Sequence, residues 1–261
     1  MLIDYDIPAI EPYINWSYFY YAWQVKDASQ RDALRREAED FLHSISTRYK
    51  AHTVFRIVNA HSDGDDIVID DDNERLALLR QQSTDSQYLC LSDFIHPQHD
   101  RLGLFATSVD VGMETDFDSD PYAKMMAQLL ADRLAEAATE RMHEEVRKNY
   151  WGYAKDENLS IPQLHSEHFQ GIRPAVGYPS LPDSSINFQL DRLLGMKQVG
   201  IRLTESGAMH PHASVSGLMI SHPASHYFSI GVVGDDQLRD YARRRSMPVE
   251  MARKFLASNL Q

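Results

Sequence analysis

Residues 171–179 of the chain read Gly171-Ile172-Arg173-Pro174-Ala175-Val176-Gly177-Tyr178-Pro179. A regular helix is excluded here, because proline lacks the backbone N–H and fixes its own φ. Glycine, in turn, permits backbone conformations and close approaches that a Cβ would block. Pro174 also pushes Arg173 toward an extended backbone. The stretch therefore predicts a rigid loop that presents one guanidinium and one phenol.

The two presented side chains suit a small ligand that has an anionic group and a flat ring. Arginine recognises carboxylates and phosphates through paired hydrogen bonds, and tyrosine combines an aromatic face with a polar tip. A plain surface turn whose arginine makes an ordinary ion pair also accounts for the loop, and the loop alone favours it, since proline- and glycine-rich turns are common on protein surfaces. The loop alone leaves both interpretations open.

Composition is that of a folded globular protein with one large domain or two small ones. The chain has 261 residues, of which 43% are hydrophobic and 25% charged. No apolar run approaches the ~18–20 residues of a membrane span. The N-terminal segment has neither the basic nor the apolar region of a secretory signal. A single cysteine, Cys90, excludes an internal disulfide, so the cytoplasm is the expected compartment.

The formal net charge of −12 disfavours nucleic acid as a partner, because an acidic protein repels phosphates. The charge is uneven along the chain. An acidic run occupies residues 63–74, and basic side chains gather over residues 239–254. We expect both segments to be solvated surface, and the basic one leaves open the docking of an acidic protein.

Hydrophobic periodicity predicts helices mixed with antiparallel hairpins rather than a parallel βαβ array. Helices are expected at 28–50, 118–149, 184–194, 235–242 and 248–256, with a short one after Ser160. Strands are expected at 53–60, 67–69, 101–111, 196–205, 214–221 and 226–233. Ser17 is a candidate cap of a short helix in the aromatic-rich segment 11–25. No boundary divides the chain, so we expect one α+β domain over residues 1–261.

Common nucleotide-binding and hydrolase motifs are absent from the sequence. There is no Rossmann glycine pattern, no Walker loop and no G-x-S-x-G elbow. Cys90 lies in an apolar run and is predicted to be buried and unreactive. The twelve histidines do not follow the spacing of a recognised zinc site, so we predict no metal ligands.

Segment 171–179 resembles the S-adenosylmethionine loop in the activation domain of cobalamin-dependent (vitamin B12-dependent) methionine synthase. Further stretches match that family in the same order, from about residue 11 to the C-terminus. They are Ile14-Asn15-Trp16, Leu91-Ser92-Asp93-Phe94, Ala131-Asp132-Arg133-Leu134-Ala135-Glu136-Ala137, Arg147-Lys148-x-Tyr150-Trp151-Gly152-Tyr153, Glu157-Asn158-Leu159-Ser160, Leu203-Thr204-Glu205-Ser206, Ala213-Ser214-Val215-Ser216-Gly217 and Ser221-His222-Pro223.

The resemblance implies a single α+β domain with a twisted antiparallel sheet flanked by helices and a shallow groove for S-adenosylmethionine. It also implies a role in the reductive methylation of cob(II)alamin to methylcobalamin, which reactivates cobalamin-dependent methionine synthase in methionine biosynthesis. A partner chain would carry the cobalamin, and flavodoxin or a similar reductant would supply the electron. By this resemblance the chain is a methyltransferase module or subunit that is not sufficient alone for methionine synthesis.

Carried over position by position, the resemblance sets Arg173 against the methionine carboxylate of the ligand. The Ala175 backbone and the Tyr178 ring would frame the adenosine, and Tyr227 and Phe228 match a late aromatic pair that contacts the ligand. No general acid or base is assigned, because reduced cobalamin is a nucleophile strong enough to need only positioning. The predicted S-adenosylmethionine-binding residues are Asn15, Arg173, Pro174, Ala175, Gly177, Tyr178, Tyr227 and Phe228.

Two positions depart from the family pattern. Asn15 stands where the family usually has an aspartate, so it offers no charge to the ligand's ammonium. Phe228 stands in place of a tyrosine, which keeps stacking but loses a hydroxyl. These changes leave open a second function, that of a non-catalytic accessory or sensor protein that binds S-adenosylmethionine or a corrinoid for another methyltransferase.

The homocysteine, folate and cobalamin modules of the full enzyme have no counterpart in this sequence, and no D-x-H-x-x-G cobalamin motif occurs. We therefore expect the chain either to act on a separate cobalamin-bearing methionine synthase chain or to be one piece of a longer protein.

Overall fold

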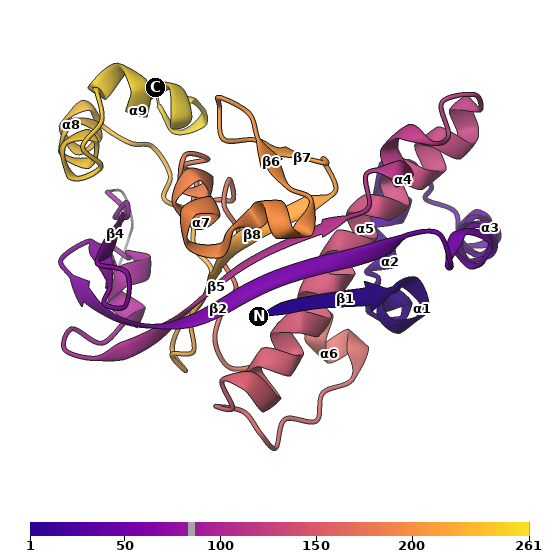
Figure 1. Ribbon diagram of the computed structural model, residues 1–261, viewed down its shortest axis with the longest axis horizontal. Coiled ribbons are helices and arrows are strands. Elements are labelled where there is room, and N and C mark those ends of the chain that lie inside the picture. Colours follow the sequence, from indigo (N-terminus) through magenta and orange to yellow (C-terminus); the bar gives the residue numbers. More distant parts are fainter. Residues whose placement is uncertain (83–86, 261) are drawn as a thin grey trace.

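A curled antiparallel sheet runs through the centre of the protein, in a computed structural model that describes residues 1–82 and 87–260 (Figure 1). Its strand order is β4-β3-β2-β5-β8, and β1 pairs with the first part of β2. All of these pairs are antiparallel, as the sequence predicted. The strands are β1 (Leu2–Asp6), β2 (Lys50–Asp63), β3 (Asp66–Ile69), β4 (Glu74–Ala77), β5 (Asp100–Val109) and β8 (Ser214–Met219).

The long helix α5 (Pro121–Glu145) crosses one face of the sheet (Figure 1). Its start is fixed by Asp120, whose carboxylate accepts from the backbone N–H groups of the first turn, and by Pro121 at the first helical position. It ends in a π-helical turn, Val146–Tyr150. The same side of the sheet carries α1 (Ile7–Ile10), α2 (Trp16–Ala22) and α3 (Ala28–Ile45), whose apolar residues join one core cluster with α5.

The opposite face of the sheet is covered by α7 (Ile186–Leu194), and the two faces follow from the alternation of side chains along each strand. Phe55 and Phe105 point into the α5 core, whereas Val54 and Leu104 point into the α7 core. Beyond the end of β4, α8 (Asp235–Arg244) and α9 (Val249–Phe255) form a third, smaller core. Further short elements include the α-helices α4 (Gly112–Thr115) and α6 (Ile161–His165) and the strands β6 (Arg202–Leu203) and β7 (Met209–His210).

Two predicted strands are wrong. Residues 226–233 form no strand, because their backbone groups bond to a loop instead: Ile230 N–H donates to the Pro179 carbonyl at 2.9 Å. Within 196–205, the left-handed glycines Gly195 and Gly200 bracket a 3-10 turn, so that only Arg202–Leu203 pairs as strand. In both cases the apolar residues reflect burial rather than ladder pairing.

The acidic run is more tightly paired than a solvated surface. Asp66 is buried, and it lies between Arg75 of β4 and Arg244 of α8. Arg80 likewise pairs with Asp65 at 2.7 Å. Part of the acidic run therefore joins the sheet to the C-terminal helices, and the expectation of plain surface is wrong for Asp66.

Cys90 is buried, as predicted, and burial raises the pKa of its thiol to about 11. The thiol therefore stays protonated and unreactive near neutral pH. In the part of the chain that the structure describes, the helices are all too short or too polar to cross a membrane.

The proline- and glycine-rich loop lies beside β8 like a further strand. The Pro174 carbonyl accepts from Leu218 N–H at 3.0 Å, and Val176 N–H donates to the Ser216 carbonyl at 2.9 Å. Ile172 and Ile220 exchange two bonds of 2.9 Å. The loop comes this close because β8 has a glycine, Gly217, opposite Ala175.

Replacing Gly217 by alanine is expected to destabilise the fold. A Cβ at this position would lie 2.2 Å from the Pro174 carbonyl oxygen and 2.9 Å from the Ala175 Cα, so backbone must move. Such overpacking costs about 1–3 kcal/mol, which urea unfolding would measure.

Gly234→Ala is the matched control, because Gly234 has a φ of −77° and its nearest neighbour is the flexible Asp236 side chain. Its stability should stay within about 0.5 kcal/mol of the parent. Equal stability of the two variants would contradict the close packing of the loop on β8.

Candidate functional site

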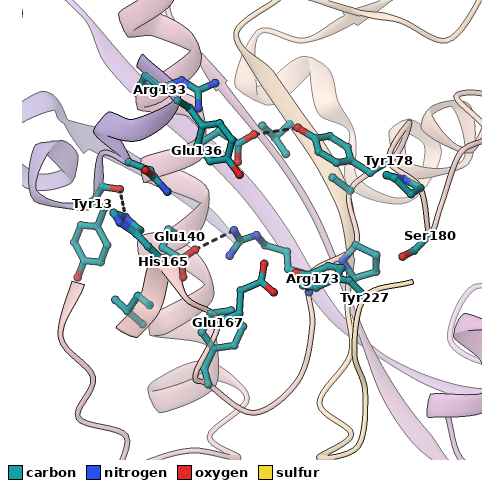
Figure 2. Close-up of a pocket in the computed structure, with 18 of the residues that line it drawn as sticks. Tyr13, Arg133, Glu136, Glu140, His165, Glu167, Arg173, Tyr178, Ser180 and Tyr227 are labelled. Carbon is teal, nitrogen blue, oxygen red and sulfur yellow. Dashed lines mark hydrogen bonds and ion pairs between the residues drawn. The ribbon is translucent and has the colours of Figure 1, made fainter. Parts of the chain in front are cut away.

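A cavity of about 640 Å³ lies between α5 and the loop (Figure 2), within the range of about 300–1,000 Å³ that is typical of small-molecule sites. Every residue predicted for the site lines it except Gly177. The lining residues are Tyr13, Asn15, Tyr18, Arg133, Glu136, Glu140, Leu164, His165, Glu167, Phe169, Arg173, Pro174, Ala175, Tyr178, Pro179, Ser180, Val215, Tyr227 and Phe228.

One wall of the cavity is a charged face of α5. Arg133, Glu136 and Glu140 are spaced three and four residues apart, which sets them above one another on the same side of the helix. The Arg133 guanidinium lies over the Tyr18 ring, with 5.6 Å from its central carbon to the ring centroid. This wall therefore offers the cavity two carboxylates and one guanidinium.

Arg173 reaches from the loop toward this wall (Figure 2). Its Nη2 lies 3.1 Å from Glu140 Oε2, and its Nη1 lies 3.1 Å from His143 Nδ1. Its side chain is only 13% exposed. Burial, the largest single effect, lowers the pKa of Arg173, but the nearby Glu140, Tyr227 and Glu136 together outweigh it and raise that pKa. The guanidinium is therefore a fixed, permanently charged donor at the cavity.

A layer of buried charge supports this arrangement from below. Arg147 is fully buried and pairs with Glu157 at 2.7 Å. Its guanidinium carbon lies 4.1 Å from the centroid of the Phe169 ring, and His143 meets the same ring edge-on. Phe169 thereby separates the buried cluster from the open cavity.

Aromatic side chains form the opposite wall. The Tyr178 hydroxyl lies 3.4 Å from Glu136 Oε1, and that carboxylate raises the pKa of the half-exposed phenol. The Tyr227 hydroxyl accepts from the backbone N–H of Arg173 at 2.9 Å, and desolvation raises the pKa of Tyr227. Phe228 is fixed through its backbone, because the Ser180 hydroxyl donates to its carbonyl and accepts from its N–H.

Asn15 lines the cavity from the start of α2. Its side-chain oxygen accepts from Ser17 N–H at 3.2 Å, so Asn15 is the N-cap and the prediction of Ser17 as cap is wrong. The cap lies two residues earlier because Asn15 keeps an extended backbone while Ser17 is already helical. His165 of α6 closes this corner, with its Nε2 3.0 Å from the Tyr13 carbonyl.

The other predicted residues belong to the loop. Pro174 and Ala175 line the cavity where the loop pairs with β8. Gly177 does not line it. With a φ of +87° and its N–H bonded to the Leu181 carbonyl at 2.8 Å, Gly177 shapes the turn that carries Tyr178.

Three carboxylates of the cavity were not predicted from the sequence: Glu136, Glu140 and Glu167. The first two had a usable signal, because charged residues recur at helical spacing on a helix whose neighbouring face is apolar. Glu167 lies in a loop and had no local signal. Glu167 is exposed as a residue, but its carboxyl faces the cavity. Desolvation raises the pKa of this carboxyl, the charge of Arg173 lowers it, and the charge of Glu140 raises it further.

Taken together, the cavity combines carboxylates, guanidinium groups and aromatic rings. Such a donor set suits a small zwitterionic or cationic ligand that also has a flat ring.

Comparisons with known proteins agree with this geometry. The family described as "Vitamin B12 dependent methionine synthase, activation domain" matches residues 6–246. A crystal structure of the MetH reactivation domain bound to AdoHcy is similar, with a TM-score of 0.93 and 37% sequence identity. The alignment covers 100% of this chain and 90% of that one.

The Glu167 carboxyl should titrate above its ordinary range, and Glu140→Gln should lower its pKa by removing a neighbouring negative charge. Because the folded pKa exceeds the unfolded one, Glu167 favours the folded state at acidic pH, and this contribution is lost as the pH rises through the folded pKa. Carbon-detected NMR titration of labelled glutamate would follow the shift. Glu145→Gln, on the same helix, is the control and should leave Glu167 unchanged; equal effects of the two variants would refute the coupling.

Proposed function

The chain belongs to the family of vitamin B12-dependent methionine synthase activation domains, and we propose that its cavity binds S-adenosylmethionine. The bound AdoHcy in the similar MetH domain supports this ligand class, since AdoHcy is S-adenosylmethionine without its methyl group. We also propose that residues 1–261 are one activation-type domain and that it works in the cytoplasm, which its single cysteine supports.

The residues present fit this ligand. Arg173 has unused N–H groups for the carboxylate, since Glu140 and His143 each take one of the five. Glu136 and Glu167 supply negative charge for the ammonium and sulfonium, although Asn15 carries none. Tyr178, with Tyr227 and Phe228, supplies the faces for the adenine. The assignment of Asn15, Arg173, Pro174, Ala175, Tyr178, Tyr227 and Phe228 as ligand-binding residues is part of the proposal.

The proposed role is to support reductive methylation on a cobalamin-bearing methionine synthase chain. One electron from flavodoxin or a similar reductant converts cob(II)alamin to cob(I)alamin, which takes the methyl group from the sulfonium and leaves S-adenosylhomocysteine and methylcobalamin. This chain's residues bind and orient the sulfonium, and no proton transfer is assigned to them. In this role the chain is a module or subunit of a methyltransferase.

The observation that carries the proposal is the convergence of the loop, α5 and the 226–230 segment on one cavity. Residues as far apart in sequence as Asn15, Arg173 and Tyr227 line the same space. A surface turn with an ordinary ion pair, the alternative for the loop, does not account for this convergence.

Methylcobalamin formation tests the proposed role. A cobalamin-bearing methionine synthase chain in the cob(II)alamin state is mixed with reduced flavodoxin and S-adenosylmethionine, with and without this chain, and the cobalamin spectrum is followed. We expect methylcobalamin only when the chain is present. Binding of S-adenosylmethionine without any gain in methylcobalamin would instead support the accessory or sensor function.

Arg173→Lys tests the site itself. Lysine keeps a positive charge beside Glu140 but loses the planar fork, so affinity for S-adenosylmethionine should fall by about tenfold or more in isothermal titration calorimetry. Arg239→Lys, an exposed arginine of α8, is the matched control and should bind like the parent. Parent-like binding by both variants would remove Arg173 from the site.

A further inference from the structure

The contacts of Arg173 contain one partner that the proposed ligand contacts do not explain. His143 lies three residues after Glu140 on α5 and is completely buried. Its Nδ1 is 3.1 Å from Nη1 of Arg173, while Glu140 Oε2 is 3.1 Å from Nη2. Two groups of one helix therefore take the two terminal nitrogens of the guanidinium.

The chemistry of this contact fixes the protonation of the ring. A guanidinium can only donate, so Nδ1 of His143 must accept and cannot carry a proton. Burial, with Arg147 and Arg173 nearby, lowers the pKa of His143 well below its ordinary value, in agreement with a neutral ring. The proton therefore lies on Nε2, which has no hydrogen-bond partner among the described residues.

A neutral acceptor at this point has a different effect from a further carboxylate. Arg173 already faces the carboxylates of Glu140 and Glu167, and a further anion beside it would increase the repulsion of a ligand's carboxylate. A neutral nitrogen orients the guanidinium without cancelling its charge. Orientation also lowers the conformational entropy that a flexible arginine would lose on binding.

The backbone of Arg173 is fixed as well. Its main-chain N–H donates to the Tyr227 hydroxyl at 2.9 Å, and the main-chain groups of the residues on either side pair with β8 and with Ile220, which follows it. The His143 ring is itself immobilised, because it meets Phe169 edge-on with ring centroids 5.1 Å apart. Little of the Arg173 side chain is left free to turn away from the cavity.

We infer that His143 is a positioning residue: its neutral Nδ1 presents the Arg173 guanidinium to the ligand, and the site thereby selects adenosyl compounds that carry a carboxylate over those that lack it. The inference rests on the proposed binding of S-adenosylmethionine. It concerns selectivity between ligands, which a purely structural role of His143 would not change.

Calorimetry with two ligands tests this selectivity. The probes are S-adenosylmethionine and decarboxylated S-adenosylmethionine, which lacks only the carboxylate. His143→Leu removes the acceptor. It should lower the affinity for S-adenosylmethionine by about tenfold and change the affinity for the decarboxylated probe by less than about twofold. His143→Asn, whose Oδ1 takes the place of Nδ1, should keep the parent's preference.

The possible outcomes separate the inference from the proposed function. If the parent binds neither probe, the proposed function falls and the inference with it. If the parent binds S-adenosylmethionine but H143L weakens both probes equally, or neither, only the inference falls. If H143L does not fold, His143→Met is a second apolar replacement, because methionine adapts to irregular space. Its affinities for the two probes are then compared in the same way.

Discussion

The cavity depends on the pairing of the 171–181 loop with the edge strand β8. Hydrogen bonds from Ile172, Pro174 and Val176 attach the loop to that strand, and Gly217 leaves room for it. The loop in turn holds the 226–230 segment through Pro179 and Ser180. Arg173, Tyr178 and Tyr227 all belong to these two segments. The pairing of the loop with β8 therefore positions the side chains that face α5.

Buried ion pairs fix the position of the loop relative to α5. Removing ions from water costs free energy that a single ion pair rarely recovers in full, so buried pairs are weak evidence for stability. Arg173 with Glu140 and Arg147 with Glu157 are better understood as groups that fix position. Both pairs attach to one continuous stretch of α5 and its π-helical end, and Phe169 packs against the buried cluster. Movement of the loop away from α5 would separate Glu140 from Arg173, and breaking such a pair is destabilising.

Local patterns were sufficient to predict the parts of the fold that depend on near neighbours. The periodicity around Leu130 and Leu134 predicted α5, and runs of β-branched, aromatic and other apolar residues predicted β2 and β5. The segment 226–233 was mispredicted because its apolar residues Ile230 and Val233 pack into the C-terminal core rather than onto a sheet. Arg173 and Tyr178 had a local signal in the loop, whereas Asn15, Tyr227 and Phe228 came only from the family resemblance. Glu136 and Glu140 were missed although their helical spacing was a signal, and Glu167 was missed because its place at the cavity exists only once the loop has docked.

The carboxylates of the cavity supply the negative charge that Asn15 lacks. Its oxygen accepts a hydrogen bond as the cap of α2, and the cavity has other anionic groups although Asn15 carries no charge. Glu136, Glu140 and Glu167 face Arg133 and Arg173, which gives these groups a formal net charge of −1. S-adenosylmethionine carries a carboxylate, an ammonium and a sulfonium, and so is net positive, whereas the demethylated product is neutral. In the proposed function, electrostatic attraction is therefore greater for the methyl donor than for its product, so transfer of the methyl group would weaken the binding of what remains.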